Sequence, residues 1–232
     1  MPEVGHSQRQ ENLANMSTRI GLIHALLESI APIEAAFASA WADAELIHLY
    51  DSSLYIDFHR AHQVTPDITR RVAALIHQSA SSGAAGLLFT GSLFSESVTS
   101  VRAQVSIPVL TAYEALIEAA LAAGSRLVLL ATVSDTIGMV EQDLAAYADL
   151  HQVSYTLESR WVRGALTALQ SGNRQQHDDL IARAAAEFES CDALILAQHS
   201  MALASQKIPH TPGRKVLTSS QTAAVRLKEL VA

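Results

Sequence analysis

The chain has 232 residues, of which 49% are hydrophobic and 17% are charged, and its formal net charge is −7 at pH 7. This length and apolar content are enough for a substantial buried core, either as one domain or as two closely packed halves. The mildly acidic balance argues against broad binding to nucleic acids or to anionic membranes, because both need clustered Lys and Arg. We therefore expect a globular protein with neither kind of partner, in which an anionic ligand is bound locally.

The start of the chain is polar and aperiodic, and we interpret residues 1–17 as a loose N-terminal extension. It has no apolar core typical of a signal peptide, and no apolar run in the chain approaches the roughly 20 residues of a membrane span. A cytoplasmic location is the default expectation. The single cysteine, Cys191, allows no internal disulfide and no thiolate pair for metal or redox chemistry.

From residue 18 onward, short leucine-rich or β-branched runs alternate with alanine-rich amphipathic stretches, a pattern typical of α/β units around a mainly parallel sheet. The predicted strands are, in chain order, Arg19–His24, Glu45–Leu49, Gly86–Thr90, Ile107–Leu110, Arg126–Thr132, Ser154–Glu158, Ala193–Gln198 and Lys215–Thr218. The predicted helices are Thr65–Ser82, Ala112–Ala123, Thr136–Leu150, His177–Glu189 and Gln221–Leu230. Pro66 suits a first helical turn, and Gly83 and Gly124 suit helix ends.

Two pairs of segments resemble each other at a separation of about a hundred residues. RIGLIHA, which begins at Arg19, resembles RLVLLAT at Arg126, and GAAGLLFTGS at Gly83 resembles SCDALILAQHS at Ser190. The repeat predicts an α/β fold of two similar Rossmann-like halves, with parallel four-stranded sheets related by pseudo-two-fold symmetry. We expect residues 18–110 with 211–232 to form the first subdomain and residues 111–210 to form the second.

Polar residues gather where four of the predicted strands end. They are His24, Thr90 to Ser92, Thr132 to Thr136 and Gln198 to Ser200. Ligands of open parallel sheets bind beyond the carboxyl ends of the strands, so two facing halves would direct these residues into one cleft. Short hydroxyl and amide side chains, with free N–H groups at helix starts, suit a carboxylate. The alternative is that they are only the polar loops that follow strands in every α/β protein.

The segments GAAGLLFTGSLFSESV, IPVLTAYEALIEAAL, SRLVLLATVSDT, CDALILAQHSMA and VLTSSQTAAVRL resemble the aspartate/glutamate racemase superfamily, and the resemblance extends over roughly residues 19–230. It implies a pseudo-symmetric fold with the active site between the halves, a homo-oligomer, and cofactor-independent isomerase activity on an amino acid or another small carboxylate. In the racemases of that family, one cysteine follows the third strand and a second follows the matching strand of the other half. One sulfur removes the α-proton and the other delivers a proton on the opposite face.

Both cysteines are absent here. The first position is Gly91, in the sequence TGS, and the second is Gln198, in AQH. Cys191 precedes the strand that leads to Gln198, so it should lie at the opposite end of the sheet, about 20 Å from the cleft at about 3.3 Å per residue. We interpret it as a structural residue. A mechanism with two thiols is therefore excluded by the composition.

Two histidines are candidates for the missing acid or base, because histidine titrates near neutral pH. His199 is preferred over His24, since it directly follows the glutamine at the second cysteine position. A structural role, with the ring hydrogen-bonded to a loop or facing a subunit partner, is the alternative. The candidate ligand-binding residues are Thr90, Ser92, Asp51, Ser134, Thr136 and Ser200, of which Ser200 and Thr136 could equally be helix N-caps.

Further candidates are weaker. Asp51 and Glu114 could orient a histidine or bind a substrate amine, and Tyr113 could cap the pocket. No HxxxH or HxH pair occurs, and His59 with His62 falls in a segment interpreted as loop, so we expect no metal. No dinucleotide or P-loop motif occurs either, in line with a protein without cofactors.

The leading hypothesis is a racemase-type isomerase that acts on a small carboxylate. One alternative is a non-catalytic carboxylate-binding protein that has lost its proton carriers. Another is a lyase similar to arylmalonate decarboxylase, which shares the glycine at the first position but keeps the second cysteine.

Overall fold

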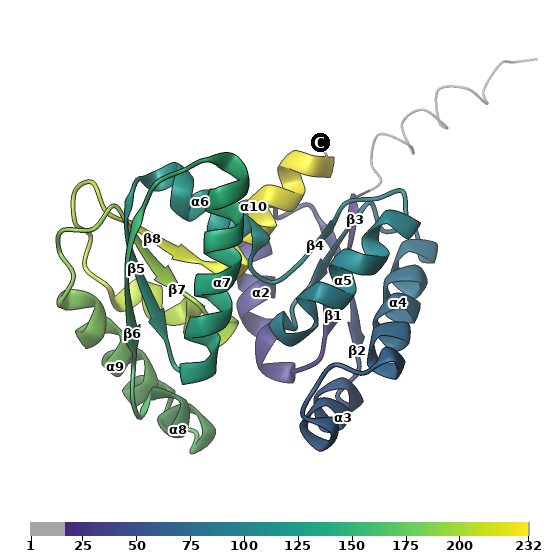
Figure 1. The fold of residues 1–232 in the computed structure, drawn as a ribbon, viewed down its shortest axis with the longest axis horizontal. Helices are drawn as coiled ribbons and strands as arrows, with labels where there is room; N and C mark the ends of the chain where they lie inside the picture. Colours follow the sequence, from purple (N-terminus) through teal and green to yellow (C-terminus); the bar gives the residue numbers. More distant parts are fainter. Residues whose placement is uncertain (1–16, 232) are drawn as a thin grey trace, which may run out of the picture.

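The structure is a computed structural model that describes residues 17–231, so the expected N-terminal extension lies outside it except for Ser17. The chain forms two four-stranded sheets with the strand orders β2-β1-β3-β4 and β6-β5-β7-β8, and every pairing is parallel. Figure 1 shows the two sheets side by side, each with its own helices. The predicted fold class, two similar α/β halves with parallel four-stranded sheets, is confirmed.

The first sheet consists of β1 (Arg19–His24), β2 (Glu45–Tyr50), β3 (Gly86–Phe89) and β4 (Val109–Leu110). The segments between its strands are η1 (Leu27–Ser29), α2 (Ile30–Ala40), α3 (Ser53–Ala61), α4 (Pro66–Ser81), η2 (Ser92–Phe94), α5 (Ser95–Val101) and η3 (Arg102–Gln104), where η denotes a 3-10 helix. Strands β1 and β3 are buried on both faces, as expected for central parallel strands covered by helices.

The second sheet consists of β5 (Arg126–Ala131), β6 (Thr156–Trp161), β7 (Ala193–Leu196) and β8 (Lys215–Thr218). The remaining helices are α6 (Glu114–Ala123), α7 (Ser134–His151), α8 (Ala165–Gln170), α9 (Arg174–Ala186), η4 (His199–Lys207) and α10 (Ser219–Val231). All eight predicted strands and all five predicted helices are present, with ends that differ by no more than three residues from the prediction.

Four helices, α2, α3, α5 and α8, are not among those predicted from the sequence. The segment with His59 and His62 was interpreted as loop, but His59 lies in α3 and His62 ends that helix with a left-handed backbone (φ 54°). Helix α4 begins as predicted, because the Thr65 side chain accepts a hydrogen bond from the Ile68 N–H group and Pro66 occupies the first turn.

The helix that follows the last strand of each half packs on the sheet of the other half. Helix α6 follows β4, yet its Leu116 and Ile117 belong to the core of the second sheet with Leu129. Helix α10 follows β8, yet its Ala224 and Leu227 pack with the first sheet. In Figure 1 the yellow α10 accordingly leaves its own sheet and lies near α2. The two halves thus exchange their final helices.

This exchange changes the expected division of the C-terminal segment. Residues 211–232 were assigned to the first subdomain, and α10 does pack there. Strand β8, however, pairs with β7 in the second sheet, where Ala193 lies opposite Lys215. The chain therefore crosses between the halves after Thr218, because β8 completes one sheet whereas the apolar face of α10 covers the other.

Candidate active site

A cavity of about 410 Å³ lies between the two halves, where the carboxyl ends of the strands meet. Its walls come from the links that follow β1, β3, β5 and β7 and from α3 and α8. The lining residues are Leu26, Glu28, Ser29, Tyr55, Thr90, Gly91, Ser92, Tyr113, Thr132, Val133, Leu166, Leu169, Gln170, Ala197, Gln198, His199 and Ser200. The lining includes Gly91 and Gln198, the two residues that stand where the resemblance places the catalytic cysteines of racemases.

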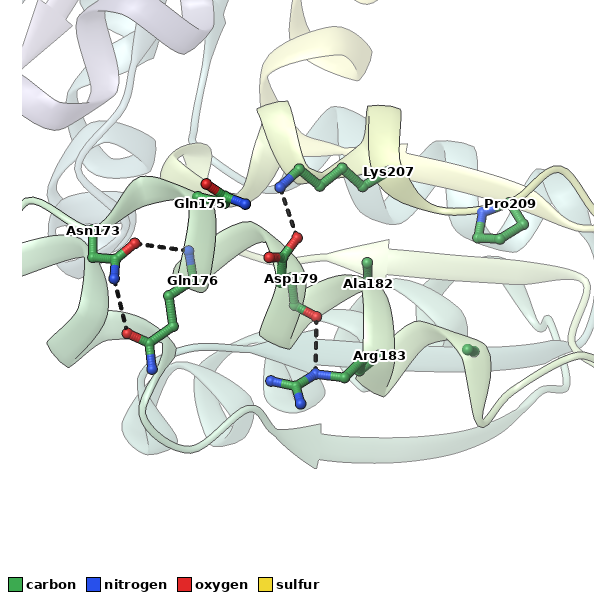
Figure 2. A pocket seen from close by; sticks show the side chains of 9 residues that line it. Asn173, Gln175, Gln176, Asp179, Ala182, Arg183, Lys207 and Pro209 are labelled. Atoms are coloured by element: carbon green, nitrogen blue, oxygen red, sulfur yellow. Dashed lines mark hydrogen bonds and ion pairs between the residues drawn. The ribbon is translucent and has the colours of Figure 1, made fainter.

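A second hollow of about 760 Å³ is wider but lies on the outer surface, between α9 and η4. Figure 2 shows its polar lining, in which Lys207 donates a hydrogen bond of 2.7 Å to Asp179. None of the predicted site residues contributes to it. We place the candidate active site in the cleft, because both halves build that cavity and unpartnered polar atoms line it.

Gly91 is the N-cap residue of η2, and its backbone (φ −84°, ψ 98°) is one that any L-residue can adopt. The restriction is steric: a Cβ atom at this position would lie 2.9 Å from Cδ2 of Phe94 and 3.1 Å from Cε1 of Phe89. The Phe94 ring is itself fixed by an edge contact with Tyr55, with 5.5 Å between the ring centroids. The space of a side chain at position 91 is therefore filled by Phe94.

Gln198 is the N-cap residue of η4, at the corresponding place in the second half. Its Oε1 atom accepts hydrogen bonds from the Thr132 N–H group at 2.9 Å and from the Thr132 hydroxyl at 3.3 Å. These two bonds fix the orientation of the amide. The other end, Nε2, is buried and has no hydrogen-bond partner among the described residues, and the residue itself lines the cavity.

The two ring nitrogens of His199 have different surroundings. Its Nδ1 atom lies 3.0 Å from the hydroxyl oxygens of both Ser219 and Ser220, at the start of α10. Its Nε2 atom is buried and has no partner in the described part of the chain. Burial lowers the pKa of His199 to about 4, and a hydrogen bond that the protonated ring donates to the Thr90 backbone carbonyl opposes this shift. The ring is therefore neutral at pH 7, as a general base must be.

His24 lies behind the cavity wall rather than in it, although it was the second candidate acid or base. Its Nδ1 atom lies 2.8 Å from Ser29 Oγ and 3.3 Å from Thr90 Oγ1, and both hydroxyl residues line the cavity. Its Nε2 atom lies 3.0 Å from Nδ1 of His48. Burial, with smaller contributions from His48 and His199, lowers the pKa of His24 to about 3. His24 thus reaches the cavity only through Ser29 and Thr90.

The other predicted residues separate into two groups. Thr90, Ser92, Ser200 and the pocket-capping candidate Tyr113 do line the cavity. Burial raises the pKa of Tyr113 to about 12, with an opposing hydrogen bond from Ser92, so Tyr113 keeps its proton and can donate a hydrogen bond. The structure thus gathers the candidates that follow β3 and β7.

Four predicted residues lie away from the cavity lining: Asp51, Glu114, Ser134 and Thr136. Asp51 accepts hydrogen bonds from the Ser53 N–H group at 2.9 Å and from Arg71 at 2.7 Å; these bonds outweigh burial and lower its pKa. Glu114 accepts from Arg102 and from the Thr111 N–H group. Ser134 is exposed at the start of α7, and Thr136 is buried in that helix without acting as its cap.

Electrostatically, the cavity has an unusual lining for a site expected to hold an anion. Among residues 17–231, no Lys or Arg lines it, and the one carboxylate in its lining belongs to Glu28, an exposed residue in η1. Neither η2 nor η4 has a side-chain cap, so the first N–H groups of both helices are open to a ligand. Such N–H groups bind carboxylates without a cationic side chain.

Cys191 is buried in the core of the second half, before β7 and away from the cavity. Its Sγ atom lies 3.6 Å from the Phe188 carbonyl oxygen, and burial raises the pKa of its thiol. Within residues 17–231, no group of three or more His, Cys, Asp or Glu side chains is arranged to hold a metal ion. No helix in that range is long and apolar enough to cross a membrane.

Fold and cavity together define a two-lobed α/β protein with a cavity between its lobes. The family model described as Asp/Glu/Hydantoin racemase matches residues 27–227, and the chain belongs to this family. The superfamily resemblance inferred from the sequence is thereby confirmed. No functionally curated protein matches the chain.

Several solved structures share the fold. Allantoin racemase from Klebsiella pneumoniae is 19% identical, with a TM-score of 0.67, over 93% of this chain and 88% of that one. An aspartate racemase homologue from Pyrococcus horikoshii is 18% identical, with a TM-score of 0.67, over 93% and 99% of the two chains. Glutamate racemase from Campylobacter jejuni is 15% identical, with a TM-score of 0.62, over 91% and 85%. At these identities the similarity establishes the fold.

Proposed function

We propose that the protein is a cofactor-independent isomerase of the racemase type, which binds a small carboxylate in the cleft and uses His199 as its base. The observation that carries the proposal is the unpartnered Nε2 atom of His199, buried beside Gln198 in a cavity built by both halves. A buried polar atom without a partner is rare in folded proteins, and in a cavity it favours contact with a ligand.

The chemistry follows from the neutral ring. Nε2 of His199 would take the proton from the carbon next to the ligand carboxylate, and the negative charge would move onto the carboxylate oxygens. N–H groups at the starts of η2 and η4, with Nε2 of Gln198, would stabilise that charge. A bound anion also favours the protonated imidazole, so the pKa of His199 should rise when the ligand is present.

The ligand classes to test come from the family and from its solved members, which include racemases of allantoin, aspartate and glutamate. We propose to incubate the protein in deuterated water with L-aspartate or L-glutamate, or with allantoin, whose acidic C–H group lies next to a ring carbonyl instead of a carboxylate, and to follow loss of the signal of that proton by NMR. His199→Asn is the decisive variant, because Asn can still bond to Ser219 and Ser220 but has no atom at the Nε2 position. Exchange that survives in His199→Asn would show that another group is the base.

A second candidate function is carboxylate binding without catalysis. It is favoured by Phe94, which fills the space of a side chain at position 91, so that the first half offers no thiol and no direct substitute for one. Binding measured by calorimetry, with neither deuterium exchange nor product, would support this alternative. A lyase similar to arylmalonate decarboxylase needs only one proton donor, and release of carbon dioxide from phenylmalonate would identify it.

The oligomeric state remains a proposal as well. The family resemblance implies a homo-oligomer, and light scattering of the purified protein would test it. A monomeric mass would overturn this part of the proposal without affecting the assignment of His199.

A further inference from the structure

A row of hydrogen-bonding groups leads from the cavity wall to the surface of the first half. Ser29, which lines the cavity, lies 2.8 Å from Nδ1 of His24. Nε2 of His24 lies 3.0 Å from Nδ1 of His48, and Nε2 of His48 lies 3.6 Å from a carboxylate oxygen of Glu34. His24 is fully buried, whereas the side chains of His48 and Glu34 are 25% and 53% exposed. The row therefore joins the cavity to solvent through otherwise buried protein.

The hydrogen bonds fix a direction along this row. The Ser29 hydroxyl donates to the Leu26 carbonyl at 2.8 Å, so its oxygen accepts from His24, which must carry its proton on Nδ1. Nε2 of His24 then has only a lone pair, and it accepts from Nδ1–H of His48. Nε2 of His48 faces Glu34, whose carboxylate stabilises a proton that arrives there.

We propose that His48 and His24 form a proton relay between solvent, at Glu34, and the Ser29 hydroxyl at the cavity wall. This inference rests on the proposed function and extends it, because it supplies the proton carrier that the first half lacks at Gly91. His199 would exchange a proton with the ligand from the second half, and Ser29 would exchange one from the first half. Imidazole suits such a relay, since it can accept a proton on one nitrogen and release one from the other.

The proton balance is simple. Inward, a proton from solvent binds Nε2 of His48, the Nδ1 proton of His48 moves to Nε2 of His24, and the Nδ1 proton of His24 moves to Ser29. The Ser29 hydroxyl turns from the Leu26 carbonyl towards the cavity, and its original proton passes to the ligand carbon. Each ring gains one proton and loses one, so neither keeps a charge, but both change tautomer. Outward transfer, when the ligand loses its proton on this side, restores the starting tautomers.

His48→Phe is a sharp test, because the rings of His24 and His48 are stacked with centroids 5.1 Å apart and phenylalanine preserves that packing. We expect the rate of deuterium exchange into L-aspartate, L-glutamate or allantoin, whichever the wild-type protein exchanges, to fall at least about tenfold with an unchanged KM. Imidazole added to His48→Ala should restore part of the rate. His77→Phe is the matched control, since His77 is a surface histidine bonded only to Gln104. An unchanged rate in folded His48→Phe would overturn the relay.

A second measurement needs no ligand and separates failure of the relay from failure of the proposed function. In the ¹⁵N-labelled protein, the relay requires protonated Nδ1 atoms on both histidines and a coupling through the hydrogen bond between Nδ1 of His48 and Nε2 of His24. His48→Phe should abolish that coupling. If His24 instead carries its proton on Nε2, the relay is wrong even if exchange depends on His199. If the coupling is present but none of the three compounds exchanges, the proposed function fails and the relay geometry stands.

Discussion

Gly91 and Gln198 are the N-cap residues of two corresponding 3-10 helices, η2 in the first half and η4 in the second. Both backbones are extended, with φ values of −84° and −87° and ψ values of 98° and 144°, and both residues line the same cavity. Their surroundings differ: Phe94 occupies the space beside Gly91, whereas Thr132 holds the amide of Gln198. Gly91 and Gln198 thus occupy corresponding positions in the two halves, but their chemical environments differ.

Gly91→Cys should destabilise the protein rather than simply restore a thiol. The new Cβ atom would meet Cδ2 of Phe94 at 2.9 Å, and forced overpacking of this kind reduces stability by about 1–3 kcal/mol. Urea denaturation should show this loss, and adding Phe94→Leu should recover part of it. Gly138→Cys is the matched control, because a Cβ there has nothing within 4 Å. Equal stability of Gly91→Cys and the wild-type protein would refute the steric account of this glycine.

Gln198→Met should also reduce stability, because it removes a hydrogen-bond acceptor from the protein interior. It leaves the buried Thr132 N–H group without its acceptor at 2.9 Å, a loss of about 1–3 kcal/mol. Gln198→Glu keeps an acceptor in place and should lose less, although it adds a negative charge to the cavity wall. Thermal unfolding of the two variants in parallel tests the assignment, and a smaller loss in Gln198→Met than in Gln198→Glu would contradict it.

Stability should rise between pH 5 and pH 7. His199 and His24 have pKa values of about 4 and about 3 in the folded protein, below the ordinary 6.5. Between about pH 4 and 6.5, the unfolded chain binds protons that the folded chain does not, so stability is complete above pH 6.5 and declines as pH falls. Each histidine contributes a slope of up to about 1.4 kcal/mol per pH unit. Urea denaturation at both pH values should show a weaker slope in His199→Asn, and an unaltered slope would show that His199 is not buried in its neutral form.

Cys191→Ala should leave any deuterium exchange unchanged. The thiol is buried before β7 and does not line the cavity, so its loss affects only the core of the second half. We expect a fall of about 1 kcal/mol in unfolding free energy and an exchange rate equal to that of the wild-type protein. A variant that remains folded but loses exchange would reopen the question of a thiol mechanism.

Much of the fold could be predicted because its signals are local. The apolar runs that begin at Arg19 and Arg126 became β1 and β5, and the glycines at 83 and 124 follow helices, with positive φ values of 83° and 156°. The division of the C-terminal segment could not be predicted. Whether β8 pairs with β7 or joins the first sheet depends on contacts between distant segments, which no local pattern reveals.

The rule that ligands bind beyond strand ends correctly predicted cavity residues after β3 and β7, but it failed for Ser134 and Thr136 after the central strand β5. Residues after β3 and β7, such as Ser92 and His199, line the cavity. Asp51 follows β2, an edge strand, and it pairs with Arg71 instead. Ser29 lies in η1, which no sequence pattern predicted, and His48 looked like an ordinary strand residue. Their roles appear only when β1 pairs with β2 and brings His24 and His48 together.

The exchange of α6 and α10 also bears on how the cleft can open. Each sheet is covered by a helix that follows the last strand of the other half. A hinge motion that separated the two sheets would therefore have to break the packing of both helices against their cores. Entry of a ligand would therefore depend on small local movements at the mouth of the cavity, where the exposed Leu26 directly precedes η1. For the same reason, a fragment that stops after β8 would lack the helix that covers the first sheet and should not fold as an independent unit.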